Sequence, residues 1–230
     1  MFVIRPIKEN DLDGLIEMLS HSGYGLTTLP KDRDVLLKRI RKSKKSFTNT
    51  EITKAGGEDY LFVMEELATH KIVGISGIIS KIGGFEPYYF YRLKTEVRQS
   101  KSLGKKIELQ TLHAEVEHSG PSEICSLFLD PLFRNSHNGR FLSLTRFLYI
   151  KQNKHLFEDE IIAEMRGQVD DEGNSPFFEA VGFKFFDIHF TEADYLSMKN
   201  KKFIKDLLPP YPIIVNLLPK EARDVVGKVH

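Results

Sequence analysis

The residues best suited to chemistry lie in a polar segment between an apolar run and a helix-like repeat. Asn138 and Gly139 stand where the helix should begin, with Arg134 and Arg140 on either side. The first N–H groups of a helix have no partner within the helix and carry partial positive charge, so they can bind phosphate oxygens. Gly139 would permit close approach of a phosphate, and Asn138 could cap the helix. The segment therefore predicts a pyrophosphate site, although a capped loop without a ligand would have a similar sequence.

The helix after this segment needs one face on the core. Four large apolar residues recur at helical spacing, and we expect them to form the buried face: Phe141, Leu144, Phe147 and Leu148. This orientation would leave Arg134, Arg140 and Arg146 available for phosphates.

The elements that must position the segment alternate between strands and helices. Strands are expected over residues 2–7, 60–66, 71–80, 88–92, 105–117, 123–129, 160–165 and 183–190. Helices are expected over residues 12–19, 31–47, 139–156 and 175–181, with short helices broken by prolines after residue 191. This alternation predicts an α/β fold with layered helices and strands.

Composition excludes several classes of protein. The chain has 230 residues and a formal net charge of +1, so its overall field gives no reason to expect a nucleic acid partner. We find no apolar run long enough for a membrane span and no signal peptide. The single cysteine, Cys125, lies in an apolar strand and suits a buried thiol in a reducing compartment, which favours a cytoplasmic protein. His113 and His118 lack supporting cysteines or carboxylates, so no metal site is predicted.

The polar segment resembles a motif of the GNAT acyltransferases. In that superfamily an Arg-x-x-Gly-x-Gly loop binds the pyrophosphate of coenzyme A, and "RNSHNG", residues 134–139, is similar to it. His137 replaces the first glycine, and a histidine at a position of positive φ would be strained. "PFFEAVGF", residues 176–183, resembles the helix and Gly-Phe segment that closes the coenzyme site in the superfamily.

Longer motifs resemble a single family, the arginine N-succinyltransferases. They include "ICSLFLDP", "FLSLTRF", "IIAEMRGQVDDEGNSPFFEAVGF", "FIKDLLPPYPI" and "LLPKEARDVVGKVH". The resemblance implies a GNAT-like fold, with a mixed, mostly antiparallel central sheet flanked by helices. It also implies an acyltransferase core over residues 1–190 and a helical extension over residues 191–230, in a chain that ends short of the usual family length.

The family resemblance implies transfer of a succinyl group from succinyl-CoA to the α-amino group of L-arginine, or of ornithine, as the first step of arginine catabolism. Succinyl-CoA would be a cosubstrate, and no permanently bound cofactor is implied. Leu127 matches the family residue assigned to succinyl-CoA binding, and His230 matches the proton donor. A strand that splays from its neighbour would leave backbone groups near Leu127 and Leu129 for the pantetheine arm.

Charge complementarity suggests two further substrate-binding residues. Glu164 could bind the guanidinium of arginine, and Arg166 could bind the succinyl carboxylate in a bidentate pair. A polar strand end followed by a solvated turn would have the same residues.

Other functions remain open at this point. The chain could be a noncatalytic coenzyme-binding or assembly subunit, or an acyltransferase that uses acetyl-CoA and another amine. It could form a homo-oligomer or pair with a complementing chain.

Overall fold

The computed structural model describes residues 1–22, 26, 29–170, 172–199 and 201–229. The chain divides into two compact units. Unit 1 comprises Met1–Pro87 and Glu117–Glu164, and unit 2 comprises Tyr88–Val116 and Met165–His230. The prediction of a core over residues 1–190 and an extension over residues 191–230 placed the boundary elsewhere.

Unit 1 is built on a five-stranded sheet in the order β1-β2-β3-β6-β7. All neighbouring pairs are antiparallel except β6 and β7, which are parallel. The strands are β1 (Phe2–Pro6), β2 (Asp59–Glu66), β3 (Lys71–Ile79), β6 (Ser122–Leu129) and β7 (Ile161–Ile162). This mixed, mostly antiparallel sheet confirms the predicted fold class.

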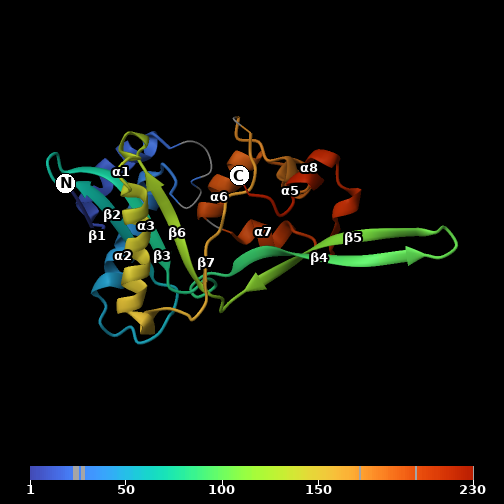
Figure 1. The fold of residues 1–230 in the computed structure, drawn as a ribbon, viewed down its shortest axis with the longest axis horizontal. Coiled ribbons are helices and arrows are strands. Elements are labelled where there is room, and N and C mark those ends of the chain that lie inside the picture. The colour runs from blue at the N-terminus through green and yellow to red at the C-terminus, as the bar shows by residue number, and fades with distance from the viewer. Residues whose placement is uncertain (23–25, 27–28, 171, 200, 230) are drawn as a thin grey trace. The chain divides into compact units, whose positions relative to one another are not determined.

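Helices cover both faces of this sheet (Figure 1). Alternate residues of β2 point to opposite faces, so they pack against different helices. Leu61 and Val63 of β2 pack in one buried cluster with residues of α1 (Leu12–Ser20) and α2 (Arg33–Thr48). Met64 of β2 packs in another buried cluster, with Leu142 of α3 (Asn138–Gln152). The helix that follows the polar segment therefore lies on the face opposite α1 and α2.

Unit 2 combines a long hairpin with short helices. The strands β4 (Tyr88–Ser100) and β5 (Lys105–Glu117) form the hairpin, and β8 (Ile213–Ile214) pairs with β5 at Thr111 and Leu112. The helices are α4 (Pro176–Ala180), α5 (Gly182–Phe186), α6 (Phe190–Lys199), α7 (Lys202–Leu207) and α8 (Lys220–Val225). A short 3-10 turn occurs at Val215–Leu217, and unit 1 has three more, at Glu9–Asp11, Pro131–Phe133 and Lys154–Leu156.

Three predicted strands differ clearly from the structure. The strand expected over residues 88–92 is longer, because β4 runs from Tyr88 to Ser100. The strand expected over residues 183–190 is wrong, because Gly182–Phe186 is helical and Phe190 begins another helix. An apolar run of this length fits a buried helix as well as a strand. The strand expected over residues 160–165 is reduced to Ile161–Ile162. No helix in the described part of the chain is long and apolar enough to span a membrane.

Candidate functional site

Strand β6 changes its backbone path halfway along its length. Ser126 has a φ of 54°, in the left-handed region, and the pairing register with β3 shifts between Ile75 and Gly77. These features define a β-bulge. On its other side β6 pairs with β7 only at Ser122 and Glu123, so in the described residues no strand covers the edge beyond them. The Leu127 side chain, at this open edge, is 44% exposed.

A buried carboxylate fixes the point where β6 enters the loop. Asp130 accepts a hydrogen bond from the backbone N–H of Leu132 at 3.0 Å, and its other oxygen lies 2.8 Å from Nδ1 of His21. Burial would raise the pKa of Asp130, but the hydrogen bonds from His21 and Leu132 outweigh burial and lower it. The loop therefore starts from an ionised, fully buried anchor.

The loop ends in a strained turn that starts α3. Ser136 and His137 have φ angles of 48° and 64°, and His137 is the residue that precedes the helix. The prediction that Asn138 caps the helix is wrong by one residue, since Asn138 is its first residue. Its side chain instead donates to the carbonyl oxygen of Phe133 at 3.0 Å, so it holds the loop closed.

The space beside the helix start is open. A Cβ atom added to Gly139 would meet only Leu129 Cδ2, at 3.8 Å. Arg134 donates from Nε to the carbonyl oxygen of Leu129 at 2.9 Å and is exposed, as is Arg140. A cavity of about 640 Å³ lies here, lined by residues 127–129 and 134–139. The structure thus brings five predicted coenzyme-binding residues to one cavity, and Arg140 follows directly in sequence: Leu127, Leu129, Arg134, Asn138 and Gly139.

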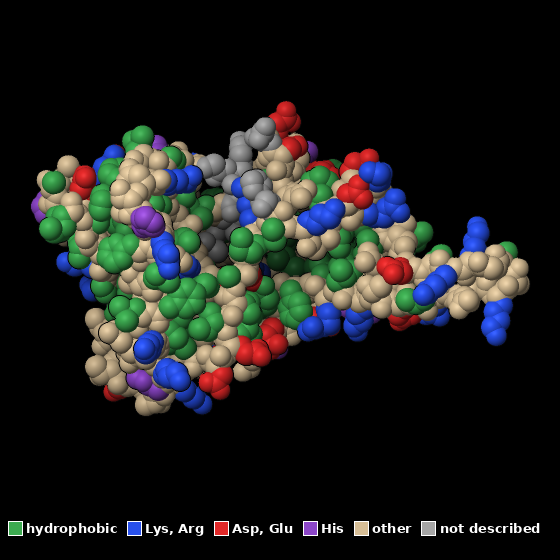
Figure 2. Space-filling model, in the orientation of Figure 1, with side chains coloured by type: hydrophobic (Ala, Val, Ile, Leu, Met, Phe, Trp, Pro, Cys, Tyr) green, Lys and Arg blue, Asp and Glu red, His purple; other side chains and the backbone are tan. Residues whose placement is uncertain are grey.

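The predicted orientation of α3 is wrong. The four residues expected on the core are exposed: Phe141, Leu144, Phe147 and Leu148. Figure 2 shows hydrophobic side chains at the surface in the region of this helix. The buried residues are Asn138, Leu142 and Arg146. Apolar residues occur on more than one side of this helix, so their spacing alone does not select the buried face. The sequence predicts an exposed Arg146 that could bind phosphates, but the structure buries this residue.

The remaining predicted site residues are not among those that line this cavity. Glu164 is exposed at the last position of unit 1, whereas Arg166 is half-buried in unit 2. Burial raises the pKa of Asp194 on α6, and the charge of Arg166 opposes that shift, which places Arg166 near Asp194. His230 lies outside the described residues, so its prediction as proton donor has no structural counterpart.

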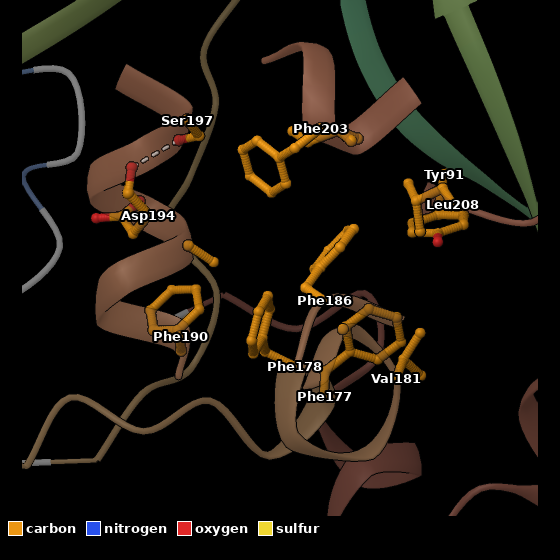
Figure 3. Close-up of a pocket in the computed structure, with 13 residues that line it drawn as sticks. Tyr91, Phe177, Phe178, Val181, Phe186, Phe190, Asp194, Ser197, Phe203 and Leu208 are labelled. Atoms are coloured by element: carbon orange, nitrogen blue, oxygen red, sulfur yellow. Dashed lines mark hydrogen bonds between the residues drawn. The ribbon is translucent and has the colours of Figure 1, made fainter. Parts of the chain in front are cut away.

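Sequence reasoning missed an apolar cavity of about 210 Å³ in unit 2. Figure 3 shows the rings of Phe178, Phe186, Phe190 and Phe203 pointing toward one another around it. The centroids of Phe186 and Phe203 lie 5.2 Å apart. The density of phenylalanines between residues 177 and 190 is the signal that could have indicated it. With this lining the cavity suits apolar groups.

The described part of the chain does not favour a nucleophilic cysteine or a metal site. Cys125 is buried, and burial raises the pKa of its thiol to about 11, although Arg39 opposes the shift. A thiol with this pKa is a poor nucleophile at neutral pH. No group of three or more His, Cys, Asp or Glu residues is arranged to hold a metal ion among the residues described.

Comparison with known proteins places this arrangement in a family. A solved structure of arginine/ornithine succinyltransferase subunit AI from Pseudomonas aeruginosa matches with a TM-score of 0.87 and 34% identity, over 100% of this chain and 67% of that chain. The arginine N-succinyltransferase subunit beta of Pseudomonas aeruginosa is 44% identical over 99% of this chain and 66% of its own length. The arginine N-succinyltransferase of Yersinia pestis is 41% identical over 100% of this chain and 65% of its own length.

The chain therefore spans about two thirds of the length of these relatives. The family model of the arginine N-succinyltransferase beta subunit matches residues 2–230. With this match and 44% identity to a relative over almost its whole length, the chain belongs to the arginine N-succinyltransferase beta subunit family.

Proposed function

We propose that this chain binds succinyl-CoA and transfers its succinyl group to the α-amino group of L-arginine, or of ornithine. The observation that carries this proposal is the cavity between the open edge of β6 and the start of α3. The relatives named above as arginine or arginine/ornithine succinyltransferases support the choice of substrates.

The coenzyme would lie along two backbone surfaces. Its diphosphate would meet the unpaired N–H groups at the start of α3, with Arg134 and Arg140 exposed beside them. Its pantetheine arm would follow the open edge at Leu127 and Leu129, as an added strand would.

The transfer itself is a direct attack of the amine nitrogen on the thioester carbonyl. An N–C bond forms, the C–S bond breaks, a base or water takes the proton that the amine nitrogen loses, and the coenzyme A thiolate takes up a proton. His230 remains our candidate for the proton donor, because a histidine pKa near 6.5 suits that role at neutral pH. Glu164 and Arg166 remain candidate substrate-binding residues.

The word "subunit" in the relatives' names supports assembly with a second copy or another chain.

The test uses a charge placed at the open helix start. Gly139→Glu puts a carboxylate where the diphosphate would lie, and Gly139→Gln adds the same bulk without charge. A Cβ atom at this position meets only Leu129 Cδ2, at 3.8 Å, so we expect both variants to fold. We expect calorimetry to show that Glu weakens binding of succinyl-CoA by about tenfold or more relative to Gln, because a charge-assisted contact becomes a repulsion.

Equal affinities of the two variants would contradict a diphosphate at this position. A second candidate function is coenzyme binding without catalysis. It is favoured by His137, which replaces a glycine of the superfamily motif and has a strained backbone with positive φ. Thiol release from succinyl-CoA in the presence of arginine separates the two functions. Binding without thiol release would support the noncatalytic subunit.

A further inference from the structure

Arg146 is a buried cation whose hydrogen-bond partners are all neutral. It is 3% exposed and lies on the face of α3 that packs against the sheet. Its Nη1 donates to the carbonyl oxygen of Cys125 at 3.4 Å, its Nη2 to the hydroxyl of Ser143 at 2.8 Å, and its Nε to the carbonyl oxygen of Ser143 at 3.2 Å. These bonds use three of the five N–H groups of a guanidinium.

Two partly buried arginines of unit 1 have carboxylate partners. Arg39 pairs with Asp59 at 2.7 Å, and Arg5 pairs with Asp11 at 2.7 Å. For Arg146, no carboxylate lies within ion-pair distance in the described residues, and burial lowers its pKa. A buried charge without a counterion is costly, and groups whose pKa burial shifts cluster at functional sites.

The position of Arg146 relates it to the acyl end of the proposed coenzyme path. It lies about two turns, or about 12 Å, along α3 from Asn138, where the diphosphate would bind. Its partner Cys125 directly precedes the bulge residue Ser126 and stands two positions before Leu127 on β6. A coenzyme that runs from the start of α3 along the edge of β6 would therefore point its acyl group toward this guanidinium.

We propose that Arg146 binds the terminal carboxylate of the succinyl group and so selects succinyl-CoA over thioesters that lack a second carboxylate. The inference rests on the proposed function, because it needs the coenzyme along β6. The carboxylate would be the missing counterion. It would accept hydrogen bonds from the two remaining N–H groups of Arg146, or take the place of the Cys125 carbonyl oxygen as acceptor. This assignment leaves Arg166 for a different substrate group.

The experiment is calorimetry on the complete chain with succinyl-CoA, butyryl-CoA and coenzyme A. Butyryl-CoA has the same four-carbon acyl chain without the carboxylate. We expect the unaltered protein to bind succinyl-CoA about tenfold to a hundredfold more tightly than butyryl-CoA, the range for a hydrogen-bonded charge pair. Arg146→Met should remove this preference and leave the affinities for butyryl-CoA and coenzyme A unchanged. Arg146→Lys should keep part of it.

Two control variants separate this role from others. Arg140→Met, on the exposed side of the same helix, should weaken all three ligands alike. Arg166→Leu should leave the preference for succinyl-CoA intact. A loss of the preference in Arg166→Leu, with no loss in Arg146→Met, would overturn the assignment.

The comparison in the unaltered protein needs no variant, so it can overturn the proposal even if Arg146→Met fails to fold, and Arg146→Lys then tests the assignment to this residue. Equal binding of succinyl-CoA and butyryl-CoA would overturn the role of Arg146 while the coenzyme site stands. Weakening of all three ligands alike by Arg146→Met would show that Arg146 only supports the bulge. If none of the three ligands binds, the proposed function and this inference are both overturned.

Discussion

Single residues fix the shape of the candidate site through unusual local choices. Ser126, Ser136 and His137 all adopt positive φ, which costs a residue other than glycine about 1–2 kcal/mol. Such conformations persist only where the surroundings hold them, and they concentrate at functional sites. Here two of the three stand directly before α3 and the third in β6, on the two surfaces that line the cavity.

Asp130 provides a pH-dependent test at this scale. Its pKa is lowered in the folded protein, so its ionised form contributes stability above the unfolded value near 3.9, and the contribution is lost as pH falls through the folded pKa. We expect Asp130→Asn to lower the free energy of unfolding by about 1–3 kcal/mol at pH 7, because hydrogen bonds to a buried charge are lost. The difference from the unaltered protein should shrink below about pH 4.

Urea denaturation between pH 3 and pH 7 measures this difference. Asp13→Asn is the control, since Asp13 pairs with Arg33 at the surface and surface pairs contribute little. A stability difference for Asp130→Asn that stays constant over the whole pH range would count against the charge of Asp130 as the cause.

At the scale of elements, α3 shows that a sequence can predict the bounds of a helix correctly and its buried face wrongly. Its bounds follow the expected segment closely, but the core receives Leu142 and Arg146 while Phe141 and Leu148 remain exposed. The side of α3 that faces the sheet carries Leu142, which packs with Met64 and Val73. The same side carries Asn138, whose side chain bonds to the loop at Phe133.

The orientation of α3 predicts unequal effects for two identical substitutions. Leu142 is fully buried, so Leu142→Ala should lower the free energy of unfolding by about 2–5 kcal/mol. Leu148 is 57% exposed, so Leu148→Ala should change it by about 0.5 kcal/mol or less. Urea denaturation of both variants checks this, and similar losses would indicate that the outer face of α3 is also covered in solution.

At the scale of the whole chain, the two units differ in how they bury their backbone. Unit 1 has a sheet with helices on both faces, whereas unit 2 has a hairpin whose β4 residues 92–99 are all exposed. A two-stranded ribbon without further packing is only marginally stable in water. The third strand, β8, supports β5 only at Thr111 and Leu112.

Hydrogen exchange should therefore rank the strands. We expect the slowest amide exchange in β2 and β3, which lie in the middle of the sheet, and fast exchange in the half of the hairpin next to the 101–104 turn. Mass spectrometry of peptic fragments gives this comparison, with the segment around Thr111 as an internal control of intermediate protection. Protection near the turn as strong as that in β2 would show that another polypeptide covers the hairpin.

The sequence by itself determined most of the elements, because strand and helix periodicity and turn residues are local properties. It also located the loop from Arg134 to Arg140 as the candidate site, since a polar segment with a glycine before a helix can be recognised without a structure. The apolar run over residues 183–190 was ambiguous on the same local grounds and was assigned wrongly.

Only the tertiary structure decided which groups meet. The bulge at Ser126 depends on pairing between β3 and β6, and nothing about a serine predicts its positive φ. The burial of Arg146 beside Cys125 depends on the rotation of α3 against the sheet. Both features come from contacts between residues far apart in the chain, and such contacts leave no mark on local periodicity.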